Sequence, residues 1–169
     1  LTGAGATCWG SNNALHSLLV GLGFDARLHA ASMFDGEINH GTTIVLIDGE
    51  RWLVDTALHG DVPAPLRTAP TSVEHEGYVT TVRPDGGSWV FDCPTPDPAV
   101  GVPCRIHDEM DAAFTLEANE KSRGWSPFNE GIVVGINDAD GVWKLKYGVL
   151  SRFEAAVATT TELTDAEVD

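Results

Sequence analysis

The pattern of apolar positions predicts one amphipathic helix close to the beginning of the chain. Leucines recur there at the i, i+3, i+4 and i+7 spacing of a helical face, at positions 15, 18, 19 and 22. Thr7 or Ser11 can cap the start of this helix, and the glycines at positions 21 and 23 can end it. Cys8 directly precedes the helical pattern, so we expect this cysteine at the helix N-terminus.

After this helix the pattern is typical of β-strands separated by turns. A strand is expected at about residues 25–34, followed by two apolar, β-branched runs on either side of Asp48-Gly49. An Asp-Gly pair between two such runs is the strongest short signal for a two-residue β-hairpin. Prolines at positions 63, 65 and 70 then indicate a loop. Further strands are expected at residues 78–83, 88–91, 114–118, 132–136 and 142–147.

These elements predict an α+β fold in which the first helix packs on an antiparallel sheet or small barrel. The length of 169 residues fits one domain, or a core domain with a smaller appendage. We expect three regions: residues 1–70 with the helix and hairpin, residues 71–150 with the antiparallel barrel, and residues 151–169 as the start of a C-terminal segment. Residues 159–169 have the pattern of a helix start, and both chain ends look cut, as in the core of a longer protein.

The charge balance excludes one class of partner. The chain has 25 acidic residues against 10 basic ones and a formal net charge of −15. Nucleic acid binding rewards clusters of Lys and Arg, so no nucleic acid partner is expected. No apolar run is long enough to span a membrane and no signal peptide is visible, so the protein is expected to be cytoplasmic and free of membrane.

Three cysteines are too few for a disulfide scaffold. Cys93 and Cys104 flank a proline-rich loop, and either a disulfide or two reduced thiols is compatible with that placement. The spacing of Cys and His residues fits no structural zinc site, so no metal is expected. Cys8 differs because a helix N-terminus offers unpaired N–H groups that favour a thiolate and can hold an oxyanion. On this feature alone, Cys8 as a purely structural residue remains open.

The hairpin brings two further candidates together. With a two-residue turn at Asp48-Gly49, Thr42 faces Asp55 across the hairpin. His40 lies two residues before Thr42 and shares its face, which makes His40 a diagonal neighbour of Asp55. An Asp beside a His accepts the Nδ1–H and fixes the tautomer, and a Cys at the other nitrogen completes an activated nucleophile. The alternative is an Asp that caps a turn beside a solvated His.

Three stretches resemble the arylamine N-acetyltransferase family: GATCWGSN, LLVGLGF and NHGTTIVLIDGERWLVDTALHG. The family has a Gly-Gly-x-Cys-x-Glu-x-Asn segment that leads into a helix, a His before a hairpin and a Leu-Val-Asp on the returning strand. The match covers roughly residues 3–66, with fainter similarity in the later strands. The resemblance implies a cysteine-proteinase-like fold, with a helical bundle ahead of Leu1 and a lid or helix after Asp169.

By that resemblance Cys8 is the nucleophile, His40 its base and Asp55 the partner of His40. It implies a ping-pong cycle in which acetyl-CoA, a co-substrate rather than a tightly bound cofactor, acylates the cysteine. An arylamine or hydrazine nitrogen then takes the acetyl group. Substrate contacts are expected from four residues: Trp9, Thr42, His59 and Phe128. Alternatives are an amide synthase using a carrier-bound acyl group, a transglutaminase-like enzyme acting on peptides, or a catalytically degenerate relative.

The chain departs from the family pattern at several positions. The Arg before the glycine pair is Ala4, the second Gly is Ala6, and the Glu after the cysteine is Gly10. The usual Gly-Phe-Gly after the Asp is replaced by TALHG, which leaves the choice of acceptor open. The acidic surface is also a poor attractant for anionic CoA, so a local cationic patch is expected around Arg67, Arg105 or Arg123.

Overall fold

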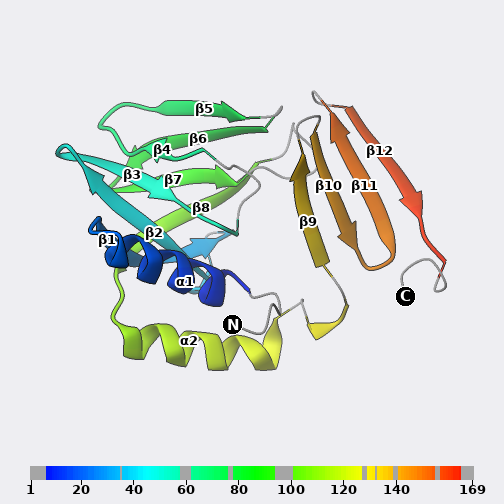
Figure 1. Ribbon diagram of the computed structural model, residues 1–169, viewed down its shortest axis with the longest axis horizontal. Helices are drawn as coiled ribbons and strands as arrows, with labels where there is room; N and C mark the ends of the chain where they lie inside the picture. Colours follow the sequence, from blue (N-terminus) through cyan, green and yellow to red (C-terminus); the bar gives the residue numbers. More distant parts are fainter. Residues whose placement is uncertain are drawn as a thin grey trace.

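The computed structural model describes residues 7–34, 36–57, 62–75, 78–93, 101–126, 129–131, 133–138, 141–154 and 157–164. Two helices and two antiparallel sheets make up this part of the chain (Figure 1). The helices are α1 (Cys8–Gly21) and α2 (Ala112–Trp125). The first sheet contains β1 (Asp25–Met33), β2 (His40–Ile47), β3 (Glu50–Val54), β4 (Ala64–Pro65), β5 (Thr71–His75), β6 (Tyr78–Asp85), β7 (Ser88–Cys93) and β8 (Val102–Glu109). The second contains β9 (Val133–Asp138), β10 (Gly141–Lys146), β11 (Val149–Glu154) and β12 (Val157–Glu162).

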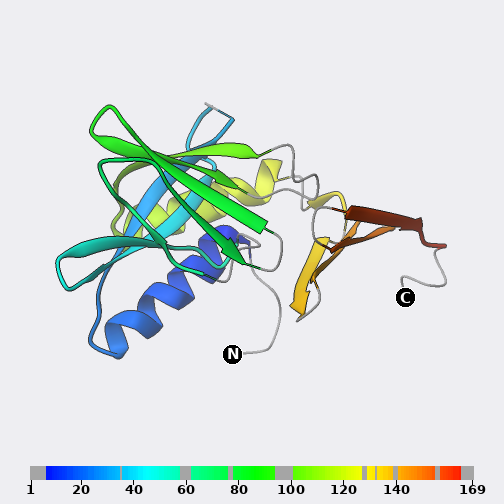
Figure 2. The same cartoon turned by 90° about the horizontal axis from the view of Figure 1, so that it is seen from above.

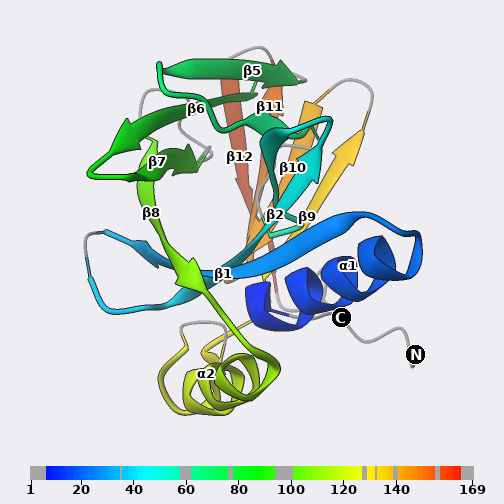
Figure 3. The ribbon, with the colours of Figure 1, turned by 90° about the vertical axis from the view of Figure 1, so that its left-hand side faces the viewer.

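The eight-stranded sheet curls into a nearly closed barrel, as the sequence pattern predicts. Its strand order is β4-β3-β2-β1-β8-β7-β6-β5, and β4 also contacts β5 and β6 at the opposite edge (Figure 3). The interior is a cluster of apolar side chains from strands all around the sheet and the residue after β4: Ala31, Ile44, Leu53, Ala64, Leu66, Val82, Phe91, Cys104 and Ile106. Because the barrel is filled by side chains, it serves as a rigid frame for the loops at its ends.

The hairpin of β2 and β3 has the predicted turn and register. Asp48 and Gly49 both have positive φ angles, 51° and 82°, as a type I′ turn requires. The paired residues include Ile47 opposite Glu50 and Thr43 opposite Val54. This register places His40 and Asp55 near one another at the end of the hairpin away from the turn.

Helix α1 lies against the outer face of β1 and β2, but its buried face differs from the predicted one (Figure 3). Its buried residues are Trp9 and Asn12, whereas Leu18 and Leu22 are 59% and 65% exposed. The helix thus contacts the sheet mainly through its first turns. In the described part of the chain, no segment covers the side that carries Leu18 and Leu22.

Residues 114–118 are not a strand but part of helix α2. Asp111 caps this helix, since its Oδ1 accepts the Phe114 N–H at 2.7 Å. Its buried residues are the polar Thr115 and Ser122, so no apolar stripe identifies the helix in the sequence. The short apolar run within it was therefore misread as a strand.

The C-terminal part also differs from expectation. Residues 157–162, which include the TTTE segment, form strand β12, so this part of the expected helix start is wrong. Residues 165–169 of that expectation lie outside the described residues. It completes a separate four-stranded sheet in the order β12-β11-β10-β9 (Figures 1 and 2). The first sheet takes strands from both sides of residue 70 and the second crosses residue 150. The division into three regions at these residues stays a prediction. Neither described helix has the length and apolar character needed to cross a membrane.

The capping of α2 can be tested by Asp111→Ala. We expect this change to lower the free energy of unfolding by about 1 kcal/mol, because the Phe114 N–H loses its acceptor. Thr7→Ala is the matched control, since Thr7 caps α1 without a side-chain hydrogen bond and its loss should cost less than about 0.5 kcal/mol. Urea unfolding measures both, and equal losses in the two variants would contradict the assignment.

Candidate active site

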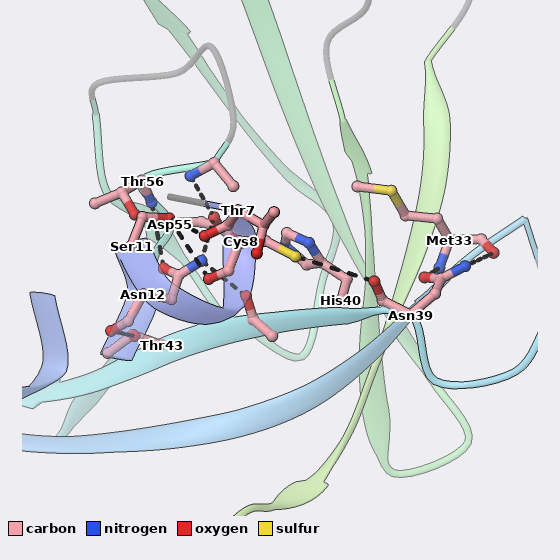
Figure 4. Close-up of polar contacts among 12 residues, drawn as sticks. Thr7, Cys8, Ser11, Asn12, Met33, Asn39, His40, Thr43, Asp55 and Thr56 are labelled. Carbon is pink, nitrogen blue, oxygen red and sulfur yellow. Dashed lines mark hydrogen bonds and ion pairs between the residues drawn. The ribbon is translucent and has the colours of Figure 1, made fainter. Parts of the chain in front are cut away.

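Three residues with complementary chemistry meet at one end of the barrel. Cys8 is the first residue of α1, His40 is the first residue of β2, and Asp55 directly follows β3 (Figure 4). The close-up shows the Cys8 sulfur beside the His40 ring, and the same ring contacts the carboxylate of Asp55. The helix, the sheet and the turn after the hairpin each supply one of the three side chains.

The ring of His40 and the carboxylate of Asp55 are hydrogen-bonded and almost fully buried. Nε2 of His40 lies 2.7 Å from Oδ2 of Asp55, and each side chain is 2% exposed. The sequence predicted that Nδ1 of His40 contacts Asp55, so this detail of the prediction was wrong. Asp55 lies beyond the last residue of β3 and diagonally opposite His40. Nε2 is the ring nitrogen farther from the His40 backbone, so this nitrogen reaches Asp55. Nδ1 is left for Cys8.

The second oxygen of Asp55 is fixed by two more donors. Oδ1 accepts from Nδ2 of Asn12 and from the Ala57 N–H, both at 2.9 Å. Asn12 also donates to the Gly41 carbonyl at 2.7 Å, and its Oδ1 accepts the Thr56 N–H at 3.3 Å. One buried amide therefore joins α1, β2 and the turn after β3.

Sequence reasoning did not select Asn12 as a site residue. Two signals could have identified it: it lies four residues after Cys8, on the same helix face, and it matches the Asn that ends the family pattern Cys-x-Glu-x-Asn. A polar residue on the buried face of a short helix requires partners, and here it has three.

The environment stabilises the charged forms of both partners. Burial alone would lower the pKa of His40, but the Asp55 carboxylate and a hydrogen bond and charge attraction from Cys8 together raise it well above its ordinary value of 6.5. Burial alone would raise the pKa of Asp55, but His40, Asn12 and the Ala57 N–H together lower it below its ordinary value of 3.8. The geometry thus favours an imidazolium between a carboxylate and a sulfur.

Cys8 is a free, partly buried cysteine at the start of α1. Its Sγ lies 4.0 Å from the carbonyl oxygen of Asn39, the residue before His40. The Asn39 side chain is itself held by Met33, accepting its N–H at 2.9 Å and donating to its carbonyl at 3.3 Å. The first hydrogen bond of the helix end runs from the Ser11 N–H to the Thr7 carbonyl, so the N–H groups of residues 8–10 precede it.

The four residues expected to contact substrate have different placements. Trp9 is 3% exposed and belongs to a core cluster, so it is a core anchor and presents almost no surface to a substrate. Thr42 is fully buried in the barrel, and its hydroxyl has no partner among the described residues. His59 and Phe128 lie outside the described residues, and their substrate contacts stay predictions.

A cleft adjoins the site on the side of α2. It has a volume of about 570 Å³ and lies between residues 37–39 and one face of the helix. Its walls include Ile38, Phe114 and Trp125, all partly exposed. Ala118, another wall residue, packs against the same core cluster as Cys8. The surface of this cleft is mainly apolar and partly aromatic, and the charged residues Glu37, Glu117 and Lys121 also line it.

Two expectations about cysteines and cations are corrected. Cys104 is a free, fully buried thiol, so the disulfide alternative for it is wrong. The expected cationic patch is neutralised, because each of its three members is paired with a carboxylate: Arg67 with Glu50, Arg105 with Asp85, and Arg123 with Glu120.

Comparisons with known proteins agree with this arrangement. A family model described as N-acetyltransferase matches residues 2–169. A search of curated protein sequences gives no match. Among solved structures, the arylamine N-acetyltransferase from Mycobacterium abscessus is similar with a TM-score of 0.83 and 20% identity, over 98% of this chain and 64% of that chain.

Two further structures carry informative descriptions. The Mycobacterium marinum arylamine N-acetyltransferase, solved in complex with CoA, has a TM-score of 0.81 and 19% identity, over 96% of this chain and 65% of that chain. An arylamine N-acetyltransferase from Bacillus cereus is described as having a unique Cys-His-Glu catalytic triad. It has a TM-score of 0.74 and 17% identity, over 97% of this chain and 70% of that chain. At these identities the likeness concerns the fold, and the chain spans less than two thirds of the length of the two mycobacterial proteins.

The buried ion pair makes stability depend on pH. The raised pKa of His40 contributes stability that is complete below pH 6.5 and is lost as the pH rises through the folded-state value. The lowered pKa of Asp55 contributes stability above pH 3.8, which is lost as the pH falls through its folded-state value. We therefore expect Asp55→Asn to cost about 3 kcal/mol at about pH 5.5 and progressively less at alkaline pH.

Urea unfolding over a pH series measures this difference. Asp25→Asn is the control, because Asp25 is a half-exposed partner of Arg27 and its loss should cost less than about 1 kcal/mol at every pH. A cost for Asp55→Asn that does not change with pH would contradict a charged pair.

Removal of the Asn12 amide should also destabilise the protein. Asn12→Ala leaves the Gly41 carbonyl and the Thr56 N–H without partners and takes one donor from Asp55, so we expect a loss of about 2–3 kcal/mol. The neighbouring, exposed Asn13 supplies the control, since Asn13→Ala should change stability by less than about 0.5 kcal/mol. Similar unfolding midpoints for the two variants would refute the role given to Asn12.

Proposed function

This chain belongs to the arylamine N-acetyltransferase family, and from that membership we propose that it transfers an acetyl group from acetyl-CoA to the nitrogen of an arylamine or arylhydrazine. The single observation that carries the proposal is the buried 2.7 Å contact of His40 with Asp55, adjacent to Cys8 at a helix N-terminus. The CoA complex of the Mycobacterium marinum relative supports CoA as the acyl carrier.

In the first half of the cycle Cys8 is the nucleophile. Its thiolate attacks the thioester carbonyl carbon, a new carbon–sulfur bond forms, and the bond to the CoA sulfur breaks. The proton held on His40 goes to the departing CoA thiolate. The product of this step is acetylated Cys8 with a neutral His40.

In the second half the amine nitrogen attacks the acetyl carbon. His40 takes a proton from that nitrogen, the carbon–sulfur bond to Cys8 breaks, and the amide leaves. Thiolate and imidazolium are then restored, so the cycle needs no other reactant. Asp55 supports both halves because it orients the ring through Nε2 and stabilises its charged form.

The start of α1 supplies a place for the negative charge that develops on the carbonyl oxygen. The N–H groups of residues 8–10 precede the first helical hydrogen bond, and the helix dipole adds positive potential there. Donors aimed at an oxyanion are commonly worth about 3–4 kcal/mol in the transition state. The adjoining cleft, with its aromatic walls, has room for an aromatic acceptor.

The anionic CoA moiety needs cations that are not already paired. Lys144 and Lys146 are two residues apart on β10 and therefore share one face of the second sheet. Among the described residues, no ion pair with a carboxylate involves either lysine, and Nζ of Lys146 lies 5.2 Å from the centre of the Tyr147 ring. Burial, followed by the charge of Lys146, lowers the pKa of Lys144, as expected where two cations face each other. An anionic ligand would relieve that repulsion, so we assign the phosphates of the donor to this face.

Covalent labelling tests the nucleophile. With acetyl-CoA labelled in the acetyl group, the unmodified protein should become labelled and Cys8→Ala should not, because Cys8 is the cysteine that contacts His40. Cys104→Ala is the matched control: this thiol is free but buried, and its removal should leave the label in place. Label that survives the Cys8 change would remove the assignment.

The choice of donor separates the proposal from the other family chemistries. Acetyl-CoA, an acyl carrier-protein thioester and a glutamine peptide are offered in turn, and release of the label to an arylamine is followed. Fastest labelling by acetyl-CoA supports the proposal. Labelling only by the carrier-protein thioester or by the peptide would identify an amide synthase or a transglutaminase-like enzyme instead.

A further inference from the structure

Helix α1 contacts strand β2 at the residue that follows His40. Gly41 is buried, and two side chains from the same face of α1 reach it: the Trp9 ring lies over its Cα, and Asn12 donates to its carbonyl at 2.7 Å. Trp9 in turn follows Cys8 directly. Cys8, which carries the sulfur, and His40, which carries the imidazole, are thus each followed directly by one of two residues that touch each other.

Position 41 has no space for a side chain. A Cβ at this position would lie 2.9 Å from Cε3 and 3.0 Å from Cζ3 of Trp9, and 3.4 Å from the Cε of Met110. Gly41 has no positive φ, so its backbone would accept any residue. The requirement for glycine here is therefore one of distance between the helix and the strand, not of backbone conformation.

The Trp9 ring has little freedom to move away. It is 3% exposed and belongs to a core cluster with Leu28, Ala30 and Met110, against which Cys8 and Ala118 also pack. Buried side chains at native packing density transmit displacements to their neighbours. A larger residue at position 41 would therefore push on the first turn of α1, which carries Cys8.

We propose that Trp9 and Gly41 form a positioning contact that sets the separation between the Cys8 sulfur and the His40 ring. Neither residue touches the reacting atoms: the indole face against the bare Cα fixes how closely α1 approaches β2. Asn12 acts at the same point and fixes the rotation of the helix through the Gly41 carbonyl. The inference rests on the proposed function in taking Cys8 as the nucleophile.

The test is the alkylation of Cys8 by iodoacetamide, which requires no acyl donor. In Gly41→Ala we expect alkylation at about pH 7 to slow about tenfold, because a displacement of a few tenths of an ångström weakens the support of His40 for the thiolate. At about pH 10, where a cysteine ionises without help, the rate should equal that of the unmodified protein. Subtracting the rate of Cys8→Ala removes labelling at other cysteines.

Two variants make the test specific. Gly21→Ala, at the far end of the same helix with no atom near its added Cβ, should alkylate like the unmodified protein. Trp9→Phe combined with Gly41→Ala removes the ring atoms that the new methyl would meet, and it should restore alkylation at pH 7 to within about twofold. If Gly41→Ala does not fold, this double variant is compared directly with the unmodified protein.

Catalysis gives a second readout. Gly41→Ala should lower kcat about tenfold with an unchanged KM for acetyl-CoA, and the double variant should recover it. Unchanged alkylation in Gly41→Ala, an equal loss at pH 7 and pH 10, or a folded double variant that stays slow would each overturn the proposal. Absence of acetyl transfer in the unmodified protein would instead count against the proposed function, since the alkylation comparison does not depend on it.

Discussion

Two side chains of opposite charge, His40 and Asp55, are removed from water and meet at 2.7 Å at one end of the barrel. Removing such charges from water costs several kcal/mol for each, and their attraction offsets this only when the remaining polar atoms also have partners. Here the second carboxylate oxygen has two, one from Asn12 and one from the Ala57 N–H. The positions of α1 and of the turn after β3 follow from this requirement.

The rest of the architecture holds the side chains of Cys8, His40 and Asp55 in place. The filled barrel fixes the direction of β2, and the I′ turn fixes the register of β3. The first turns of α1 pack against β2. The sulfur comes from a helix, the imidazole from a strand and the carboxylate from the turn that follows. None of these elements holds more than one of the three groups, so the site exists only when all of them are assembled.

Much of this could be read from the sequence where local chemistry decides the structure. The Asp48-Gly49 pair predicts the turn, and the turn predicts that His40 and Asp55 share a face. The choice of Nε2 over Nδ1 could not be predicted, because it depends on how far Asp55 lies beyond the end of β3. Helix α2 was not predicted because its buried residues, Thr115 and Ser122, are polar. Helical spacing is detected through apolar residues and therefore did not reveal this helix.

The residues of the candidate site also differ in how well the sequence predicts them. Cys8, His40 and Asp55 carry recognisable chemistry and were selected, whereas Asn12 and Gly41 act through shape and hydrogen bonding and have no chemical signature of their own. Trp9 could be a wall of the substrate pocket or an anchor of the core, and its exposed fraction of 3% favours the core. The leucines of α1 formed the most regular pattern in the chain, yet Leu18 and Leu22 are exposed, since periodicity alone does not say which neighbour is present.

The order of these elements along the chain has a consequence for how the protein acquires its structure. Cys8 and Asp55 are separated by 46 intervening residues, and the β2–β3 hairpin between them closes through a two-residue turn. The pairing of β1 with β8 instead joins residues far apart in sequence, for example Ala31 and Ile106, across a much longer loop. Short loops lose less chain entropy on closing and pair sooner, so the order of the elements favours assembly of helix and hairpin before the circle of strands is complete.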